Sequence, residues 1–415
     1  MKPASSAARP DLVCVSHLTW DWVWQRPQQL LARLSRHYPV LYVEEPWIRI
    51  GPPSDELTVR EVEPNLRVAR LELCSDPDTF WRRLDETRDR DGFHPSEVSR
   101  DIEAATLMFE SRFQPRLEDE VGRYVAGWRR KDAPLVLWLY TPMVVRFVDL
   151  LGPDLVVYDA MDELSSFRSA PPRLAELERD LLARADLVFA GTPSVYERKT
   201  SRHPDVHLFP SGVEPADFAP ARDARLPPPR ELQGAPRPVV GYCGVIDERS
   251  DLDLLASVAD LRPDWTWVLV GPVIKIEERA LPRRRNIVYA GKKRYDELPQ
   301  YLAAFDVTMI PFAMNDATRY LLPTKTLEYM AAGKPVVSTP VPDVVASFGS
   351  VVRIAATPEE FVGQVEAALR ETDGERTSRV RHEETLLAAH SWDGVVGRMR
   401  SLIEDRLVRK PAARA

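Results

Sequence analysis

Short apolar runs alternate with amphipathic stretches along the first half of the chain. The runs that predict strands lie at residues 12–16, 40–43, 135–140, 155–159 and 187–190. Between them, residues 25–36 and 173–185 have leucines at helical spacing. Apolar runs of this length, separated by helices, are typical of a parallel sheet that helices cover on both faces. The stretch 52–127 has a poorer pattern and predicts little.

The pattern restarts in the second half, after a proline-rich break. Seven prolines lie within residues 214–238, which have little apolar periodicity. We interpret this segment as an inter-domain linker. The strands predicted beyond it lie at residues 239–243, 266–270, 286–289, 307–310, 336–338 and 351–354. Residues 358–408 are predicted to be helical.

Two strand–helix repeats joined by a linker predict an α/β protein with two doubly wound, Rossmann-like domains that face each other across a cleft. A length of 415 residues agrees with two domains. The predicted boundaries are residues 1–213 for the first domain, 214–238 for the linker and 239–390 for the second domain. We expect residues 391–415 to form a C-terminal helix that crosses back to the first domain. Ligands of such sheets bind beyond the carboxyl ends of the strands.

Composition argues against some classes of binding partner and favours one kind of cellular compartment. The formal net charge of −7 argues against nucleic acid, which requires a clustered positive field. The three cysteines, Cys14, Cys74 and Cys243, are widely spaced and predict buried thiols in a reducing compartment. No apolar stretch has the length of a membrane span. We therefore expect a cytoplasmic protein, and peripheral contact with the inner face of the membrane stays open.

The most informative segment is residues 315–335, which follow the fourth predicted strand of the second half. Pro323 and Thr324 are typical of a helix start, and Gly333 and Pro335 of a helix end. The start of this helix would open at the carboxyl edge of the sheet. Free backbone N–H groups and the helix dipole at such a position favour a phosphate.

Two charged residues in this predicted helix fit a nucleoside diphosphate. Lys325 adds a full positive charge in the first turn. Glu328 follows three residues later on roughly the same face. A carboxylate can accept hydrogen bonds from two adjacent hydroxyls, as in a ribose diol. The alternative is an exposed ion pair between the two side chains, worth only about 0.2–0.5 kcal/mol.

The residues from Glu328 to Val337 read E-Y-M-A-A-G-K-P-V-V. This stretch resembles the donor-site motif of glycosyltransferases with the GT-B fold, particularly family 4, in which the glutamate holds the ribose. Two further motifs resemble a bacterial subgroup of cell-wall and exopolysaccharide biosynthesis. They are W-Q-R-P-Q at residues 24–28 and G-Y-C-G-V-I-D-E-R at residues 241–249. The resemblance covers nearly the whole chain.

The resemblance implies a set of donor-binding residues and one departure from the family pattern. Family 4 usually has a second glutamate eight positions before the ribose-binding one, and Tyr320 occupies that position here. Side chains of the preceding loop are the alternatives in its place, namely Asn315, Asp316, Thr318 and Arg319. Thr324 and Thr326, which flank Lys325, are also assigned to donor binding.

Other cations are candidates for the departing diphosphate. In family 4, the loop after the first strand of the second domain brings an arginine and a lysine to the diphosphate. Arg249 is the matching arginine, whereas Ser250, Asp251 and Leu252 stand where the lysine usually lies. A cation there would stabilise the charge that grows as the glycosidic bond breaks. Lys275 is a second candidate, and an arginine on a solvated turn is the alternative for Arg249.

In the first domain, the candidates follow predicted strands. His17, after the first strand, is a candidate contact for the acceptor or the transferred sugar, with a structural role as the alternative. Arg26 is a candidate anion contact. Asp159, Asp162 and Glu163 follow a later strand, where a base for an acceptor hydroxyl would lie, and we assign them to the acceptor side.

Together these features predict a glycosyltransferase of the hexosyltransferase type. It would move a sugar from a nucleotide diphosphate donor to a saccharide or lipid-linked acceptor, with retention. No metal site is expected, because no D-x-D string follows a strand and no histidine–cysteine cluster has zinc spacing. No cofactor is expected besides the nucleotide sugar. The alternatives are a sugar-nucleotide 2-epimerase or a phosphorylase of the same fold, and a degenerate accessory protein that binds nucleotide sugar.

Overall fold

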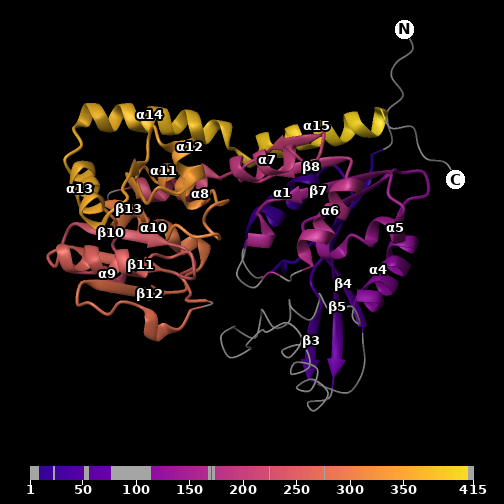
Figure 1. The fold of residues 1–415 in the computed structure, drawn as a ribbon, viewed down its shortest axis with the longest axis horizontal. Coiled ribbons are helices and arrows are strands. Elements are labelled where there is room, and N and C mark those ends of the chain that lie inside the picture. The colour runs from indigo at the N-terminus through magenta and orange to yellow at the C-terminus, as the bar shows by residue number, and fades with distance from the viewer. Residues whose placement is uncertain are drawn as a thin grey trace, which may run out of the picture. The chain divides into compact units, whose positions relative to one another are not determined.

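The computed structural model describes residues 9–21, 24–50, 56–75, 114–166, 170, 173–223, 225–274 and 276–409. The chain divides into two compact units (Figure 1). Unit 1 is formed by Met1–Gly191, Val195–Phe209 and Asp393–Ala415, and unit 2 by Thr192–Ser194 and Pro210–Trp392. Each unit has its own sheet, and each is described by itself below.

The sheet of unit 1 is almost entirely parallel. Its strands are β1 (Asp11–Val15), β2 (Val40–Val43), β3 (Trp47–Ile50), β4 (Glu56–Glu63), β5 (Leu66–Ser75), β6 (Leu135–Leu139), β7 (Leu155–Ala160), β8 (Leu187–Ala190) and β9 (Val206–Leu208). The order is β3-β5-β2-β1-β6-β7-β8-β9, and β4 pairs with β5. Strands β1, β2, β6, β7 and β8 are buried along their whole length, which explains their continuous apolar character.

The antiparallel hairpin of β4 and β5 was not predicted. Its turn contains Pro64 and Asn65, and Asn65 adopts the left-handed conformation with φ of 65°. Asparagine tolerates this conformation better than most residues, and Pro-Asn between strands is a turn signal. The hairpin lies in the stretch 52–127, where exposed positions of β4 interrupt the apolar pattern.

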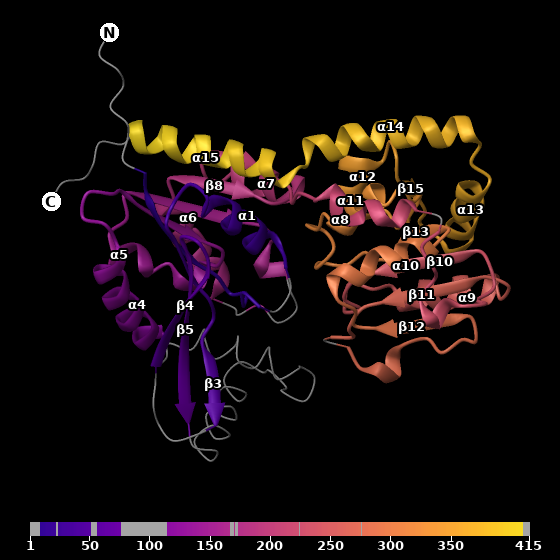
Figure 2. The same cartoon turned by 180° about the vertical axis from the view of Figure 1, so that it is seen from behind.

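Helices cover the sheet of unit 1, including one from the end of the chain. They are α1 (Arg26–Leu34), α4 (Gln114–Trp128), α5 (Phe147–Leu151), α6 (Leu174–Arg184), α7 (Pro193–Thr200), whose first two residues belong to unit 2, and α15 (Trp392–Arg409). Figure 2 shows α15 beside α1 and α7. The Tyr38 hydroxyl donates a 2.8 Å hydrogen bond to Glu404, and Arg33 pairs with Asp393 at 2.9 Å. These contacts fasten α15 to unit 1.

The sheet of unit 2 is entirely parallel. Its strands are β10 (Val239–Cys243), β11 (Thr266–Val270), β12 (Ile287–Gly291), β13 (Val307–Ile310), β14 (Val336–Ser338) and β15 (Arg353–Ile354). Their order, β12-β11-β10-β13-β14-β15, is that of a doubly wound Rossmann sheet. The chain reverses direction across the sheet between β10 and β13, and this topological switch point is where ligands of such folds bind.

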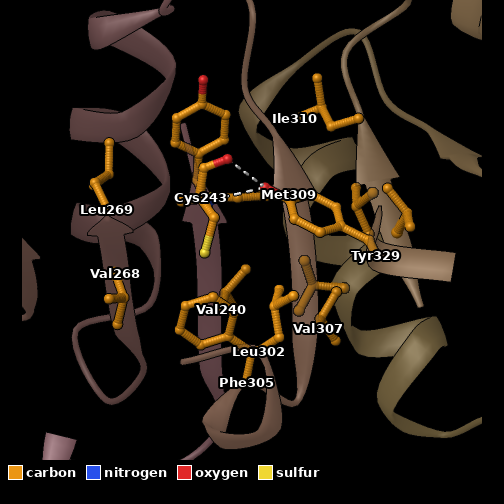
Figure 3. Packing of buried hydrophobic residues seen from close by; sticks show 14 of the residues in the cluster. Val240, Cys243, Val268, Leu269, Leu302, Phe305, Val307, Met309, Ile310 and Tyr329 are labelled. Atoms are coloured by element: carbon orange, nitrogen blue, oxygen red, sulfur yellow. Dashed lines mark hydrogen bonds between the residues drawn. The ribbon is translucent and has the colours of Figure 1, made fainter. Parts of the chain in front are cut away.

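Helices and one buried core complete unit 2. The helices are α8 (Pro215–Phe218), α9 (Leu252–Leu261), α10 (Leu298–Ala304), α11 (Lys325–Ala331), α12 (Pro342–Phe348), α13 (Pro358–Leu369) and α14 (Asp373–Ala389). Figure 3 shows core side chains of β10, β13 and α10 packed together, Val240, Met309 and Leu302 among them. The Tyr329 hydroxyl of α11 accepts a 2.8 Å hydrogen bond from the backbone N–H of Cys243, which links α11 to β10.

The proline-rich segment 214–238 is not a free linker. It belongs to unit 2, where Phe218 and Leu232 are buried in the core. Arg222 donates a 2.8 Å hydrogen bond to the carbonyl of Ala331 at the end of α11. The prolines keep the helices of this segment short and obscure the periodicity, but the apolar residues between them still pack against the domain.

Most predicted elements are confirmed. The strands at 40–43, 187–190, 239–243, 266–270, 307–310 and 336–338 have the predicted ends, and the others differ by one or two residues. The α/β class with two parallel sheets is confirmed as well. Among the described helices, none has the length and apolar character needed to cross a bilayer.

Candidate donor site

Two loops meet at the switch point of unit 2. One follows β10 and the other follows β13, and backbone hydrogen bonds join them. The N–H of Ala313 donates to the carbonyl of Arg249, and the N–H of Asp251 donates to the carbonyl of Pro311, both at 2.8 Å. The Asn315 amide donates to the carbonyl of Glu248 at 2.8 Å. The loop that precedes α11 is therefore fixed against the end of β10.

Glycines bring the backbone close to the first turn of α11. A β-carbon at Gly244 would lie 2.3 Å from Cε and 2.8 Å from Nζ of Lys325. A β-carbon at Gly271 would lie 1.9 Å from the carbonyl oxygen of Gly244. These distances are shorter than real contacts. Position 271 therefore requires glycine because of the backbone of Gly244, and position 244 requires glycine while Lys325 keeps its place.

Lys325 and Glu328 lie together in the first turn of α11, and both are partly exposed. Neither side chain forms a hydrogen bond or an ion pair with another residue in the described part of the chain. The alternative of a direct ion pair between the two is therefore not supported. Lys325 Nζ instead lies 5.5 Å from the ring centroid of Tyr242.

The surroundings disfavour the charged form of both groups. Burial lowers the pKa of Lys325, an effect that the charge of Glu328 opposes and that of Arg249 reinforces. Burial raises the pKa of Glu328, and the charge of Lys325 opposes that shift. An anion beside Lys325 and a hydroxyl pair beside Glu328 would compensate both charges, and pKa shifts of this kind are common at functional sites.

The start of α11 differs from the predicted open helix end. The helix has only seven residues, and the hydroxyl of its N-cap residue, Thr324, forms no capping bond. The N–H groups of Thr326 and Leu327 donate to the carbonyls of Pro323 and Thr324 at 3.1 and 3.0 Å. These N–H groups are already used, so the positive charge at this position comes mainly from Lys325.

Two assigned donor-binding residues are corrected. The hydroxyls of Thr318 and Thr326 belong to fully buried side chains. Thr318 donates a 2.5 Å hydrogen bond to the carbonyl of Ala313 and stabilises its own loop. Burial keeps both side chains away from a donor. Thr318 has a structural role, and the Thr326 hydroxyl has no hydrogen-bond partner among the described residues. Asn315 is exposed, and its amide joins the two loops as described above.

The remaining cation candidates are Arg249 and Lys275, and only Arg249 lies in the described part of the chain. Arg249 forms a bidentate pair with Asp247, with Nε–Oδ1 at 2.8 Å and Nη2–Oδ2 at 2.6 Å. The pair has little net charge, so Lys325 is the main cation of the site. Lys275 lies outside the described residues.

Tyr320, which stands where the family usually has a second glutamate, is partly exposed, and its carbonyl accepts a 3.3 Å hydrogen bond from the Thr192 hydroxyl.

In unit 1, the assignment of Arg26 and Asp159 to the acceptor side is corrected. Arg26 is 4% exposed and Asp159 is fully buried. Arg26 binds both carboxylate oxygens of Asp159, with Nη2–Oδ1 at 2.9 Å, and its Nη1 donates to the carbonyl of Phe209 at 2.7 Å. This buried pair ties α1 to β7 and to the end of β9 and is unavailable to a ligand.

His17 and the residues after β7 have different surroundings. His17 is partly exposed, while its Nδ1 is buried and has no hydrogen-bond partner among the described residues. Burial lowers the pKa of His17 to about 4, so the ring is neutral at pH 7. Burial raises the pKa of Glu163, but the Lys199 ammonium at 2.8 Å outweighs this and leaves it low. Glu163 is thus structural, and Asp162 beside it is partly exposed.

Three residues of the site were not assigned from the sequence, namely Tyr242, Gly244 and Tyr329. A signal was present for Gly244, because it directly follows the predicted strand 239–243 and a glycine there allows close backbone approach. No group of three or more metal-binding side chains occurs in the described ranges.

Comparisons with known proteins give the site its context. Residues 237–371 match the family model described as glycosyl transferases group 1. The putative teichuronic acid biosynthesis glycosyltransferase TuaH of Bacillus subtilis (strain 168) is 29% identical, and the match covers 53% of this chain and 63% of that protein. The match thus spans less than two thirds of that relative.

Solved structures share the whole fold. An E. coli structure described as trehalose-6-phosphate bound with UDP-2-fluoro glucose has a TM-score of 0.69 at 14% identity, covering 96% of this chain and 99% of that chain. The UDP-forming α,α-trehalose-phosphate synthase of Burkholderia vietnamiensis has a TM-score of 0.68 at 16% identity, covering 96% and 98%. These structures share the fold of this chain, and the match to the glycosyl transferases group 1 model lies within unit 2, which contains the candidate donor site.

Proposed function

We propose that this protein transfers a sugar from a nucleotide diphosphate donor and that unit 2 binds the donor at the carboxyl ends of β10 and β13. One observation supports this proposal above the others. Lys325 and Glu328 share the first turn of α11 at the topological switch point, and neither has a hydrogen bond or ion pair to another described residue. The lysine suits a diphosphate, and the carboxylate suits the two hydroxyls of a ribose.

The proposed chemistry follows from where charge develops. As the bond between the anomeric carbon and the diphosphate oxygen breaks, both electrons go to the diphosphate. The acceptor hydroxyl oxygen forms the new bond to that carbon and releases its proton. Lys325 would stabilise the departing diphosphate more strongly than the intact donor, which lowers the barrier. Glu328 would hold the ribose and fix the orientation of the donor.

The finer features of the reaction are part of the proposal. We propose a saccharide or lipid-linked acceptor in polysaccharide biosynthesis, in line with the teichuronic acid relative. UDP-sugars are the first donors to test, because the synthases of similar fold are described as UDP-forming. Retention, independence of metal ions, a cytoplasmic location and peripheral membrane contact stay predictions from the sequence.

The test is a donor screen with product analysis. Purified protein is incubated with UDP-sugars and GDP-sugars, with and without EDTA, and release of the nucleoside diphosphate is followed. We expect slow donor hydrolysis without acceptor, unaffected by EDTA, and loss of this activity in Lys325→Ala. Hydrolysis that is equal in the wild type and in Lys325→Ala would refute the donor site.

A further inference from the structure

The ring of Tyr242 lies beside the ammonium group of Lys325. Tyr242 is the penultimate residue of β10 and is 1% exposed. Its ring centroid lies 5.5 Å from Lys325 Nζ. The face of an aromatic ring has the negative end of the ring quadrupole, so it attracts an ammonium group within about 6 Å. Tyr242 therefore contacts the cation of the proposed site without being able to bind phosphate through its buried ring.

Tyr242 is itself held on two other sides. Its hydroxyl donates a 2.9 Å hydrogen bond to the carbonyl of Val245. The ring of Phe312 packs against it edge-to-face, with centroids 6.0 Å apart and an interplanar angle of 69°. Phe312 is fixed in turn, because the Thr339 hydroxyl accepts from its N–H at 3.2 Å and donates to its carbonyl at 2.7 Å. The ring cannot turn away from Lys325 without breaking these contacts.

A lysine side chain at this position needs a neighbour that restrains its conformation. Its side chain is flexible and has many rotamers in water. Gly244 leaves open the space that Cε and Nζ occupy, so on that side no side chain restrains them. An aromatic face that attracts the ammonium orders the side chain before a ligand arrives.

We infer that Tyr242 is a positioning residue: its ring holds the Lys325 ammonium in the place where it meets the donor diphosphate. This inference rests on the proposed donor site and adds to it a residue that acts through Lys325 rather than on the substrate. The role belongs to the aromatic ring and not to the hydroxyl, which is occupied by Val245.

The test compares Tyr242→Phe, which keeps the ring, with Tyr242→Leu, which removes it. The dissociation constants of inorganic pyrophosphate and of UDP are measured by calorimetry from pH 7 to pH 10. We expect about tenfold weaker binding of both ligands by Tyr242→Leu. We also expect its affinity to fall at a lower pH than in the wild type, because the lysine loses a contact that favours its charge. Tyr242→Phe should bind within about twofold of the wild type.

A double-mutant cycle separates positioning from general damage to the core. In the Lys325→Met background, Tyr242→Leu should cause no further loss of pyrophosphate affinity, because its effect passes through the lysine. Additive losses would overturn the inference, and so would equal losses in Tyr242→Phe and Tyr242→Leu. If Tyr242→Leu does not fold, Phe312→Leu replaces it in the cycle, with a smaller expected loss that must also vanish without the lysine.

The design distinguishes this inference from the proposed function. Failure of the proposed function would appear as equal ligand affinity in the wild type and in Lys325→Met. Failure of the inference alone would appear as a clear dependence on Lys325 combined with unchanged affinity and an unchanged alkaline limb in Tyr242→Leu.

Discussion

The side chain of Lys325 fills the space at the carboxyl end of β10 that a side chain at Gly244 would need. A β-carbon on the glycine would lie 2.3 Å from Cε of the lysine. The two residues are far apart in the sequence, and the switch point of the sheet brings them together. The place of the lysine therefore depends on the absence of a side chain in the neighbouring loop.

Gly244→Ala should displace Lys325, because the new methyl group would lie 2.3 Å from Cε of its flexible side chain, and the Tyr242 hydroxyl, 2.7 Å from that methyl group, would also have to shift. We expect at least tenfold weaker binding of pyrophosphate, with a thermal midpoint within a few degrees of the wild type. The matched control is Gly363→Ala in α13, where nothing lies within 4 Å of the added carbon. Wild-type affinity in Gly244→Ala would show that this placement of Lys325 is not the binding one.

Donor affinity should depend on pH on both sides of neutrality. Burial lowers the pKa of Lys325, so the ammonium loses its proton at a lower pH than an ordinary lysine and affinity should fall as pH rises. Lys325→Arg should move this fall to higher pH, because guanidinium stays protonated. Burial raises the pKa of Glu328, so affinity for UDP should also fall on acidification. A flat titration between pH 5 and pH 10 would contradict both assignments.

The Arg26–Asp159 pair should contribute to stability and not to ligand binding. Removal of one partner leaves a buried charge, so Asp159→Asn should lower the free energy of unfolding by about 3–5 kcal/mol. The partly exposed pair Arg184–Asp180 offers the control, because Asp180→Asn should cost no more than about 1 kcal/mol. Chemical denaturation measures both. Equal costs would mean that burial of the first pair is energetically irrelevant.

Glu383 should make stability fall with rising pH. This side chain of α14 is 1% exposed, and burial raises its pKa to about 7, against the opposing charge of Arg379. Between the ordinary pKa of 4.5 and about 7, the folded state therefore binds more protons than the unfolded state. Stability from the protonated form is present below this window and is lost across it, by up to about 3 kcal/mol at 1.4 kcal/mol per pKa unit.

Glu383→Gln removes this titration. Its stability relative to the wild type should increase between pH 5 and pH 8 by up to about 3 kcal/mol in urea denaturation. Glu384→Gln, at the exposed neighbouring position, should show no such change. A constant difference between Glu383→Gln and the wild type over this range would refute the raised pKa.

Buried parallel strands could be predicted because each one is a continuous apolar run, as in 239–243 and 307–310. The helix with Lys325 and Glu328 could be predicted from the residues that start and stop it. The hairpin of β4 and β5 could not, because its solvent-facing positions break the apolar pattern. The proline-rich segment was misjudged because its contacts with the core of unit 2 are long-range.

Site residues were less predictable than strands. Arg26 begins the helix after the first strand and Asp159 lies near the carboxyl end of β7, where ligand-binding residues are common, yet they neutralise each other in the core. Thr318 and Thr326 lie beside the site in sequence, but their side chains point to the interior, which spacing alone did not reveal. Tyr242 was missed because a tyrosine inside an apolar strand looks like any core residue. Its role depends on a lysine that only the fold brings to it.

The most direct test of the donor site compares three ligands and three variants by calorimetry. UDP and GDP contain a ribose and a diphosphate, whereas inorganic pyrophosphate has no ribose. We predict that Lys325→Ala weakens binding of all three ligands by tenfold or more. Glu328→Gln should weaken only the nucleotides and leave pyrophosphate unchanged, and Glu384→Gln should change nothing. Unaltered nucleotide affinity in both Lys325→Ala and Glu328→Gln would contradict the assignment of the donor site to α11.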